Sequence, residues 1–71
     1  MQVLILKTNI RYKKHLKEVA PLLDSQHNIF RWNVDLQDRD KVLRVEAAAL
    51  SVNDIIQLIQ KAGFHCEELA D

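Results

Sequence analysis

The side chains that could bind a metal ion are few, and they are not spaced as a metal site requires. The chain contains three histidines and one cysteine, which are His15, His27, His65 and Cys66. Their positions include no CxxC or HxxxH pair, the spacings that place two ligands beside one ion. His65 and Cys66 are adjacent, so in a strand their side chains point to opposite faces. We therefore predict no metal site, with Cys66 buried, His65 exposed and His15 on the solvent side of a helix.

Catalytic arrangements are also hard to assemble from this sequence. Asn9 and Arg11 lie close together and could contact a phosphate group, but no glycine-rich loop accompanies them to expose backbone N–H groups. No Ser-His-Asp or Cys-His arrangement for nucleophilic catalysis can be built. Residues 42–47 lack the aromatic side chains on which an RNA-recognition strand stacks bases. The sequence predicts a protein that is not an enzyme and needs no cofactor.

Basic residues are concentrated near the start of the chain. No acidic residue lies among the five cations Lys7, Arg11, Lys13, Lys14 and Lys17. An exposed cation near the amino-terminal end of a helix costs about 0.3–1 kcal/mol, because the helix dipole is positive there. This region is either a solvated helix face or a docking patch for an acidic partner protein. The residues of the candidate patch are Arg11, Lys13, Lys14 and Lys17.

Length and composition limit the classes of protein to which this chain can belong. The 71 residues form a single domain, residues 1–71. Ten Lys and Arg balance ten Asp and Glu, which argues against a nucleic-acid-binding protein. The longest apolar runs, residues 3–6 and 19–23, are far shorter than the roughly 18 residues of a membrane span. One cysteine forms no internal disulfide, which favours a reducing compartment, most simply the cytoplasm.

The hydrophobic pattern of the first two thirds of the chain predicts four elements. Residues 1–7 carry aliphatic side chains at both odd and even positions, which would face opposite sides of a strand, as in a central strand of a sheet. Apolar residues recur at helical spacing from about residue 12 to residue 23 or 24, with lysines between them. Residues 30–36 and 42–47 alternate between apolar and polar side chains, which predicts a hairpin. Trp32 lies on the apolar side of that alternation, so we expect it in the core.

The last third of the chain predicts a helix and a short strand. Ser51 and Asp54 form an approximate capping box before a helical apolar pattern, and Gly63 stands where a helix stop belongs. Residues 64–69 then form the final strand. The order β, α, β, β, α, β predicts an α+β, ferredoxin-like fold, in which two helices cover one face of a four-stranded antiparallel sheet.

Three short segments carry a resemblance to a known family. Residues 7–12, Lys-Thr-Asn-Ile-Arg-Tyr, stand where that family has Met-Thr-Cys-x-x-Cys between its first strand and first helix. Residues 33–36, Asn-Val-Asp-Leu, match its second strand, and residues 61–64, Lys-Ala-Gly-Phe, match its Lys-Ala-Gly-Tyr/Phe turn. In these segments the chain resembles the heavy-metal-associated domain of copper chaperones and copper-pumping ATPases.

The resemblance implies that the usual copper site is degenerate. In the family, two thiolates bind copper(I), because soft sulfur suits a soft ion. Asn9 and Tyr12 stand at those two positions, and Lys7 replaces the methionine beneath the loop. Thr8 and Phe64 keep the pattern of the family. We therefore expect this chain to bind copper(I) poorly.

The uncovered face of the sheet must also carry apolar side chains from the first strand. We expect Lys7 to share the parity of Val3 and Ile5 and to face the helices. Its ammonium group would then approach the carbonyl groups of the first loop or the Tyr12 hydroxyl. The even-numbered residues Leu4 and Leu6 would then face outward. Together with Val42 they would form an apolar patch that supports weak self-association.

Three functions remain open. The leading hypothesis is a heavy-metal-associated-like domain that has lost its cysteine pair and acts by binding a partner protein or a copy of itself. The resembled copper chaperones use a lysine-bearing first helix in this way. The first alternative is a copper or zinc carrier with non-standard ligands. The second is a small-ligand sensor like the ACT domains, which share the topology.

Overall fold

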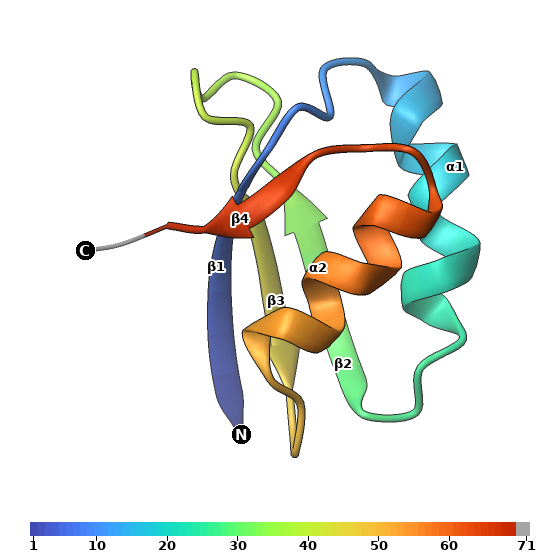
Figure 1. The fold of residues 1–71 in the computed structure, drawn as a ribbon, viewed down its shortest axis with the longest axis vertical. Helices are drawn as coiled ribbons and strands as arrows, with labels where there is room; N and C mark the ends of the chain where they lie inside the picture. Colours follow the sequence, from blue (N-terminus) through green and yellow to red (C-terminus); the bar gives the residue numbers. More distant parts are fainter. Residues whose placement is uncertain (70–71) are drawn as a thin grey trace.

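The computed structural model describes residues 1–69 and contains six helices and strands (Figure 1). Their order is β, α, β, β, α, β, as the hydrophobic pattern predicted. Most boundaries lie within two residues of the predicted ones, and the last strand is shorter because its regular pairing covers only three residues. The elements are β1 (Gln2–Thr8), α1 (Lys13–Asp24), β2 (Ile29–Val34), β3 (Leu43–Ala47), α2 (Val52–Lys61) and β4 (Cys66–Glu68).

The strands form one antiparallel sheet in the order β2-β3-β1-β4. β1 therefore lies in the interior of the sheet, as its aliphatic composition predicted. Its register against β3 pairs Leu4 with Val45 and Leu6 with Leu43. Both helices lie on the same side of the sheet (Figure 1). The predicted ferredoxin-like arrangement is confirmed.

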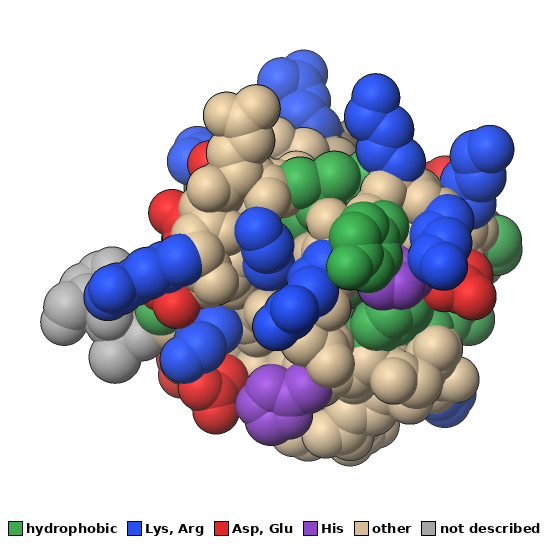
Figure 2. Space-filling model, turned by 90° about the horizontal axis from the view of Figure 1, so that it is seen from above, with side chains coloured by type: hydrophobic (Ala, Val, Ile, Leu, Met, Phe, Trp, Pro, Cys, Tyr) green, Lys and Arg blue, Asp and Glu red, His purple; other side chains and the backbone are tan. Residues whose placement is uncertain are grey.

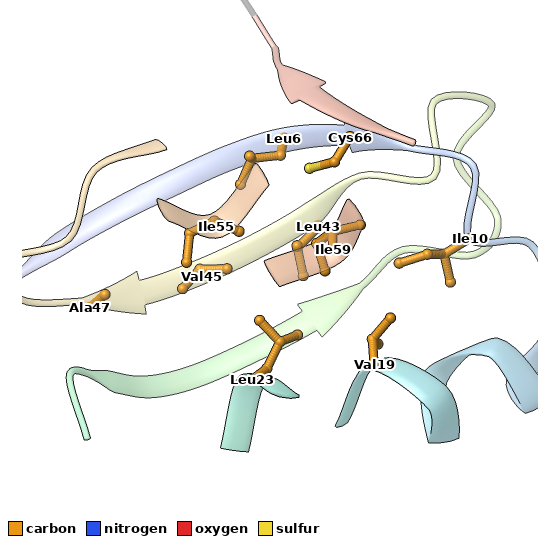
Figure 3. Close-up of a cluster of buried hydrophobic side chains, with 10 residues drawn as sticks. All are labelled: Leu6, Ile10, Val19, Leu23, Leu43, Val45, Ala47, Ile55, Ile59 and Cys66. Atoms are coloured by element: carbon orange, nitrogen blue, oxygen red, sulfur yellow. The ribbon is translucent and has the colours of Figure 1, made fainter. Parts of the chain in front are cut away.

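The core fills the space between the sheet and the two helices (Figure 3). Side chains with no solvent exposure come from the strands, from α1 and α2, and from the loop after β1. Trp32 is half-buried against this cluster, as predicted, and its indole N–H donates a hydrogen bond to the Asp24 carboxylate at 2.8 Å. The central members are Leu6, Ile10, Val19, Leu23, Leu43, Val45, Ile55 and Ile59.

The predicted orientation of β1 is wrong. Leu6 is fully buried and Leu4 packs against the core, whereas Val3 is 44% exposed on the other face. Both parities of β1 are apolar, so the strand alone could not decide which side faces the helices. Pairing with β3 decided it, because Leu43 and Val45 point into the core opposite Leu6 and Leu4.

Two consequences follow for residues on the open face. The apolar patch predicted from Leu4, Leu6 and Val42 is wrong, because Leu6 lies in the core. Val42 instead borders a shallow, largely polar depression together with Ile5. Self-association itself stays a prediction.

Local signals at the ends of α2 are confirmed. The Ser51 hydroxyl accepts a hydrogen bond from the Asp54 N–H at 3.1 Å, and the Asp54 carboxylate accepts one from the Ser51 N–H at 2.9 Å. Gly63 has a φ of +90°, the left-handed conformation that ends a helix. Within residues 1–69, no helix has the length and apolar character needed to cross a membrane.

Candidate functional site

Two buried residues, Thr8 and Ile10, anchor the loop between β1 and α1 to the rest of the domain. The Thr8 side chain is 6% exposed, and its hydroxyl accepts a hydrogen bond from the Ile10 N–H at 3.2 Å. The same hydroxyl donates a hydrogen bond to the carbonyl oxygen of Lys41 at 2.6 Å. Ile10 inserts its side chain into the core. These contacts hold the loop firmly against the β2–β3 loop, residues 35–42.

Asn9 joins this loop to the segment before β4. Its side-chain oxygen accepts a hydrogen bond from the His65 N–H at 2.8 Å. Its own N–H donates to the His65 carbonyl oxygen at 3.3 Å. The carboxamide therefore crosslinks two segments that are distant in sequence, and its NH₂ group donates no hydrogen bond among residues 1–69.

Tyr12 immediately precedes α1 and stacks edge-on against His15, with ring centroids 5.1 Å apart. The His15 ring also lies 4.9 Å from the Phe64 ring. His15 Nδ1 accepts hydrogen bonds from the N–H groups of Arg11 and Tyr12, at 3.2 and 3.4 Å. His15, predicted on the solvent side of the helix, is half-buried, because its ring packs against Tyr12 and Phe64. Its imidazole also satisfies N–H groups that begin the helix.

The candidate metal ligands do not converge. Within residues 1–69, no three His, Cys, Asp or Glu side chains lie close enough together to hold one metal ion. Cys66 is 3% exposed, as predicted, and His65 is exposed. Burial raises the pKa of the Cys66 thiol to about 11, and the Glu67 carboxylate adds to the increase. The thiol therefore stays protonated near neutral pH, whereas copper(I) needs thiolate.

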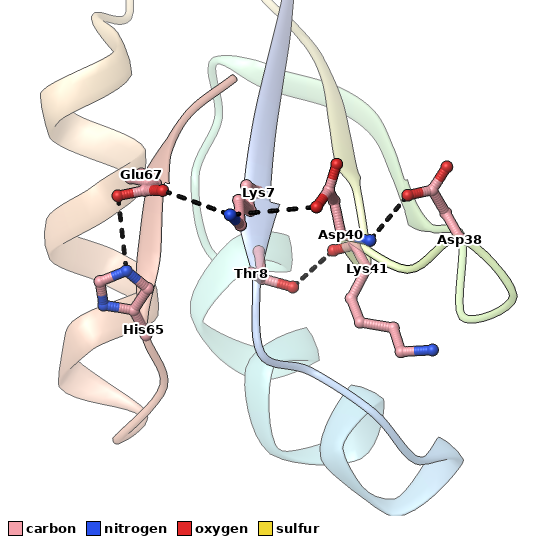
Figure 4. A network of polar contacts seen from close by, with 7 residues as sticks. All are labelled: Lys7, Thr8, Asp38, Asp40, Lys41, His65 and Glu67. Atoms are coloured by element: carbon pink, nitrogen blue, oxygen red, sulfur yellow. Dashed lines mark hydrogen bonds and ion pairs between the residues drawn. The ribbon is translucent and has the colours of Figure 1, made fainter. Parts of the chain in front are cut away.

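Lys7 lies on the open face of the sheet, away from the helices (Figure 4). Its ammonium group is 3.9 Å from the Asp40 carboxylate and 3.8 Å from the Glu67 carboxylate. Glu67 also lies 3.6 Å from the His65 imidazole. The predicted contacts of Lys7 with the loop carbonyls or the Tyr12 hydroxyl are wrong, because they depended on the opposite orientation of β1.

A pocket of about 470 Å³ opens beside the first loop. We call it the basic pocket. Its cationic walls come from the end of β1, the first loop and the β2–β3 loop, and Figure 2 shows Lys and Arg side chains gathered over this end of the molecule. Thr8, Asn9 and His65 complete the lining. The four cations are Lys7, Arg11, Arg39 and Lys41.

Sequence reasoning selected Lys7 and Arg11 but missed Arg39, Lys41 and His65 as parts of one site. Arg39 and Lys41 lie between the two predicted strands of the hairpin, residues 30–36 and 42–47. The relevant signal was their place at the end of that hairpin, which pairing of β3 with β1 brings beside the first loop. The Thr8 N–H donates to the Asp40 carbonyl oxygen at 3.0 Å and fixes this arrangement.

The other predicted cations form a separate surface on the first turns of α1. Lys13, Lys14 and Lys17 are exposed, and no acidic residue occupies the first turn of the helix. The Lys14 ammonium lies 5.7 Å from the centroid of the Tyr12 ring. Arg11 is exposed beside this surface and also lines the basic pocket, so it belongs to both. We call the set Arg11, Lys13, Lys14 and Lys17 the docking surface.

The sequence matches no protein-family model and no curated protein. Solved structures do match. A copper-binding domain from HMA7, a P-type ATPase, is 22% identical over 99% of this chain and 96% of its own, with a TM-score of 0.84. The yeast copper transporter domain Ccc2a is 18% identical over 100% of this chain and 99% of its own, with a TM-score of 0.83.

The Atx1–Cu(I)–Ccc2a complex also matches, at 18% identity over 100% of this chain and 99% of that chain, with a TM-score of 0.83. At these identities the likeness concerns the fold. The structure thus confirms, over nearly the whole length of the chain, that this protein has the fold of copper-binding heavy-metal-associated domains.

Proposed function

We propose that this chain is a small non-enzymatic domain that acts by docking an acidic partner protein rather than by carrying copper on a cysteine pair. The observation that carries the proposal is the replacement of two thiolates by Asn9 and Tyr12, beside an exposed basic helix face. The single buried cysteine is compatible with a reducing compartment such as the cytoplasm.

The charges of the docking surface support this proposal. Among residues 1–69, the ion pairs involve Lys7, Arg31 and His65, and none of them uses a cation of the docking surface. Cations at the beginning of a helix are unfavourable in the free protein. An acidic partner would relieve this cost, and opposite charges would steer the two proteins together.

The fold supports docking as well. One of the matching structures is a complex between Atx1 and Ccc2a. Here the first loop is held by Thr8, Asn9 and His15, so it presents a preorganised surface. A preorganised surface binds with less loss of conformational entropy than a mobile one.

The test compares two variants of equal charge change. Lys13→Gln with Lys14→Gln alters the docking surface, whereas Arg44→Gln with Lys61→Gln alters exposed cations elsewhere. Partners are captured from the native host with the wild type, identified, purified and titrated against all three proteins. We expect the first variant to bind at least about tenfold more weakly and the control to bind like the wild type. Equal binding by all three proteins would refute the proposal.

Copper handling is the second candidate function, favoured by the copper-binding domains among the matching structures. It would require ligands other than a cysteine pair, because this chain has one cysteine. Competition for copper(I) against a strong chelator separates this function from docking. A stoichiometric complex that survives the chelator would establish copper binding.

A further inference from the structure

The basic pocket lies where three distant segments meet, and its lining differs from the docking surface except at Arg11. Every charged side chain that lines it is basic. We infer that the basic pocket binds a small polyanion that carries at least two phosphate groups.

The charges of the basic pocket are only partly compensated. Lys7 lies within 4 Å of the carboxylates of Asp40 and Glu67. The Lys41 ammonium donates a hydrogen bond to the Leu36 carbonyl oxygen at 2.6 Å, a contact that does not neutralise it. Arg11 and Arg39 take part in no ion pair among residues 1–69. A bound anion would offset the repulsion between these cations.

Hydrogen bonds within and between the loops hold the walls of the basic pocket in place. The Asp38 carboxylate accepts a hydrogen bond from the Asp40 N–H at 2.8 Å and shapes the turn that carries Arg39. Lys41 has a φ of +46°, and the Thr8 hydroxyl binds its carbonyl oxygen (Figure 4). A non-glycine residue in this conformation is held there by its surroundings. These contacts therefore fix the backbone positions from which the two loops extend their cations.

The chemistry of the lining specifies the ligand class. The pocket has about 470 Å³, a volume in the range of small-molecule sites and far above that of one simple ion. Its side chains are cationic or polar, with no aliphatic residue to receive an apolar group. Two guanidinium groups offer the planar donors that match phosphate oxygens, and the Asn9 NH₂ group adds a neutral donor. One carboxylate would leave most of this positive charge uncompensated.

The experiment uses the whole chain and inorganic pyrophosphate as the probe, with inorganic phosphate and a short Asp-rich peptide as separate arms. Backbone amide shifts are followed in low salt. We expect pyrophosphate to shift the amides of Thr8, Asn9 and Lys41 in a saturable way. It should bind more tightly than phosphate or the peptide, and affinity should fall as salt is raised.

The decisive variant is Arg11→Gln with Arg39→Gln, since neither side chain makes an ion pair that the fold would lose. Its affinity for pyrophosphate should fall at least about tenfold, because two charge-assisted contacts are removed. The matched control, Lys13→Gln with Lys14→Gln, removes the same charge outside the basic pocket, so it should weaken binding much less than the decisive variant does.

Three results would overturn the inference. They are no saturable shift at millimolar pyrophosphate, equal weakening by the variant and its control, and tighter binding of the peptide. The Lys13 and Lys14 control is also the variant that tests the docking surface. Loss of partner docking with intact pyrophosphate binding, or the reverse, therefore separates the two proposals.

Discussion

The hydroxyl of Thr8 and the carbonyl oxygen of Lys41 are joined by a 2.6 Å hydrogen bond across 33 residues of sequence. The same hydroxyl accepts from the buried N–H of Ile10, so one side chain holds both loops that border the basic pocket. This relationship makes Thr8 a structural residue as well as part of the pocket wall.

Replacing Thr8 by Val should therefore lower the free energy of unfolding by about 1–3 kcal/mol, because two backbone groups lose their partner. Thr8→Ser keeps the hydroxyl and should lose much less. Urea unfolding of both variants measures the difference. A loss in Thr8→Ser as large as that in Thr8→Val would contradict a dominant role of the hydroxyl.

Copper(I) binding should appear when two cysteines are introduced into the loop between β1 and α1. The wild type should lose copper(I) to a strong chelator, whereas Asn9→Cys with Tyr12→Cys should retain one equivalent, because two thiolates suit the soft ion. Each single variant is the control and should retain less than the pair. No gain in the double variant would argue against a family-like geometry of this loop.

His15 should contribute to stability through the start of α1. His15→Ala leaves the N–H groups of Arg11 and Tyr12 without their acceptor, and it also removes the ring contact with Phe64. Loss of a helix cap typically costs about 1 kcal/mol. His27 is exposed, and His27→Ala should change stability by less than about 0.5 kcal/mol. Equal effects at the two histidines would contradict a capping role.

Cys66 should be unreactive in the folded protein. Its pKa of about 11 keeps the thiolate scarce near neutral pH, so alkylation should be much slower than in the urea-unfolded chain. Mass spectrometry of timed alkylation reactions measures both rates. Rapid modification of the native protein at neutral pH would contradict this environment.

The Cys66 thiol should also make the free energy of unfolding depend on pH in alkaline solution. Below the unfolded pKa of 9.0 the thiol is protonated in both states; above it the unfolded chain loses the proton first, and ionisation favours unfolding. The free energy of unfolding should therefore fall by on the order of 2 kcal/mol between about pH 9 and 11. Cys66→Ala should lack this slope, and an identical slope in both proteins would assign it to other groups.

Local sequence signals determined much of the secondary structure. The alternation around Trp32 predicted a half-buried strand, and Ser51, Asp54 and Gly63 predicted both ends of α2. These features depend on residues only a few positions apart. The family resemblance was likewise local, because it rests on residues 7–12, 33–36 and 61–64. It led to the expectation that Asn9 and Tyr12 stand in place of the copper ligands.

Tertiary structure decided what local periodicity left open. β1 has apolar side chains at both parities, so only its pairing with β3 placed Leu6 inside and Lys7 outside. The basic pocket likewise depends on contacts over 33 and 56 residues, from Thr8 to Lys41 and from Asn9 to His65. No local pattern encodes such contacts, because they form only when the packed sheet brings its loops together.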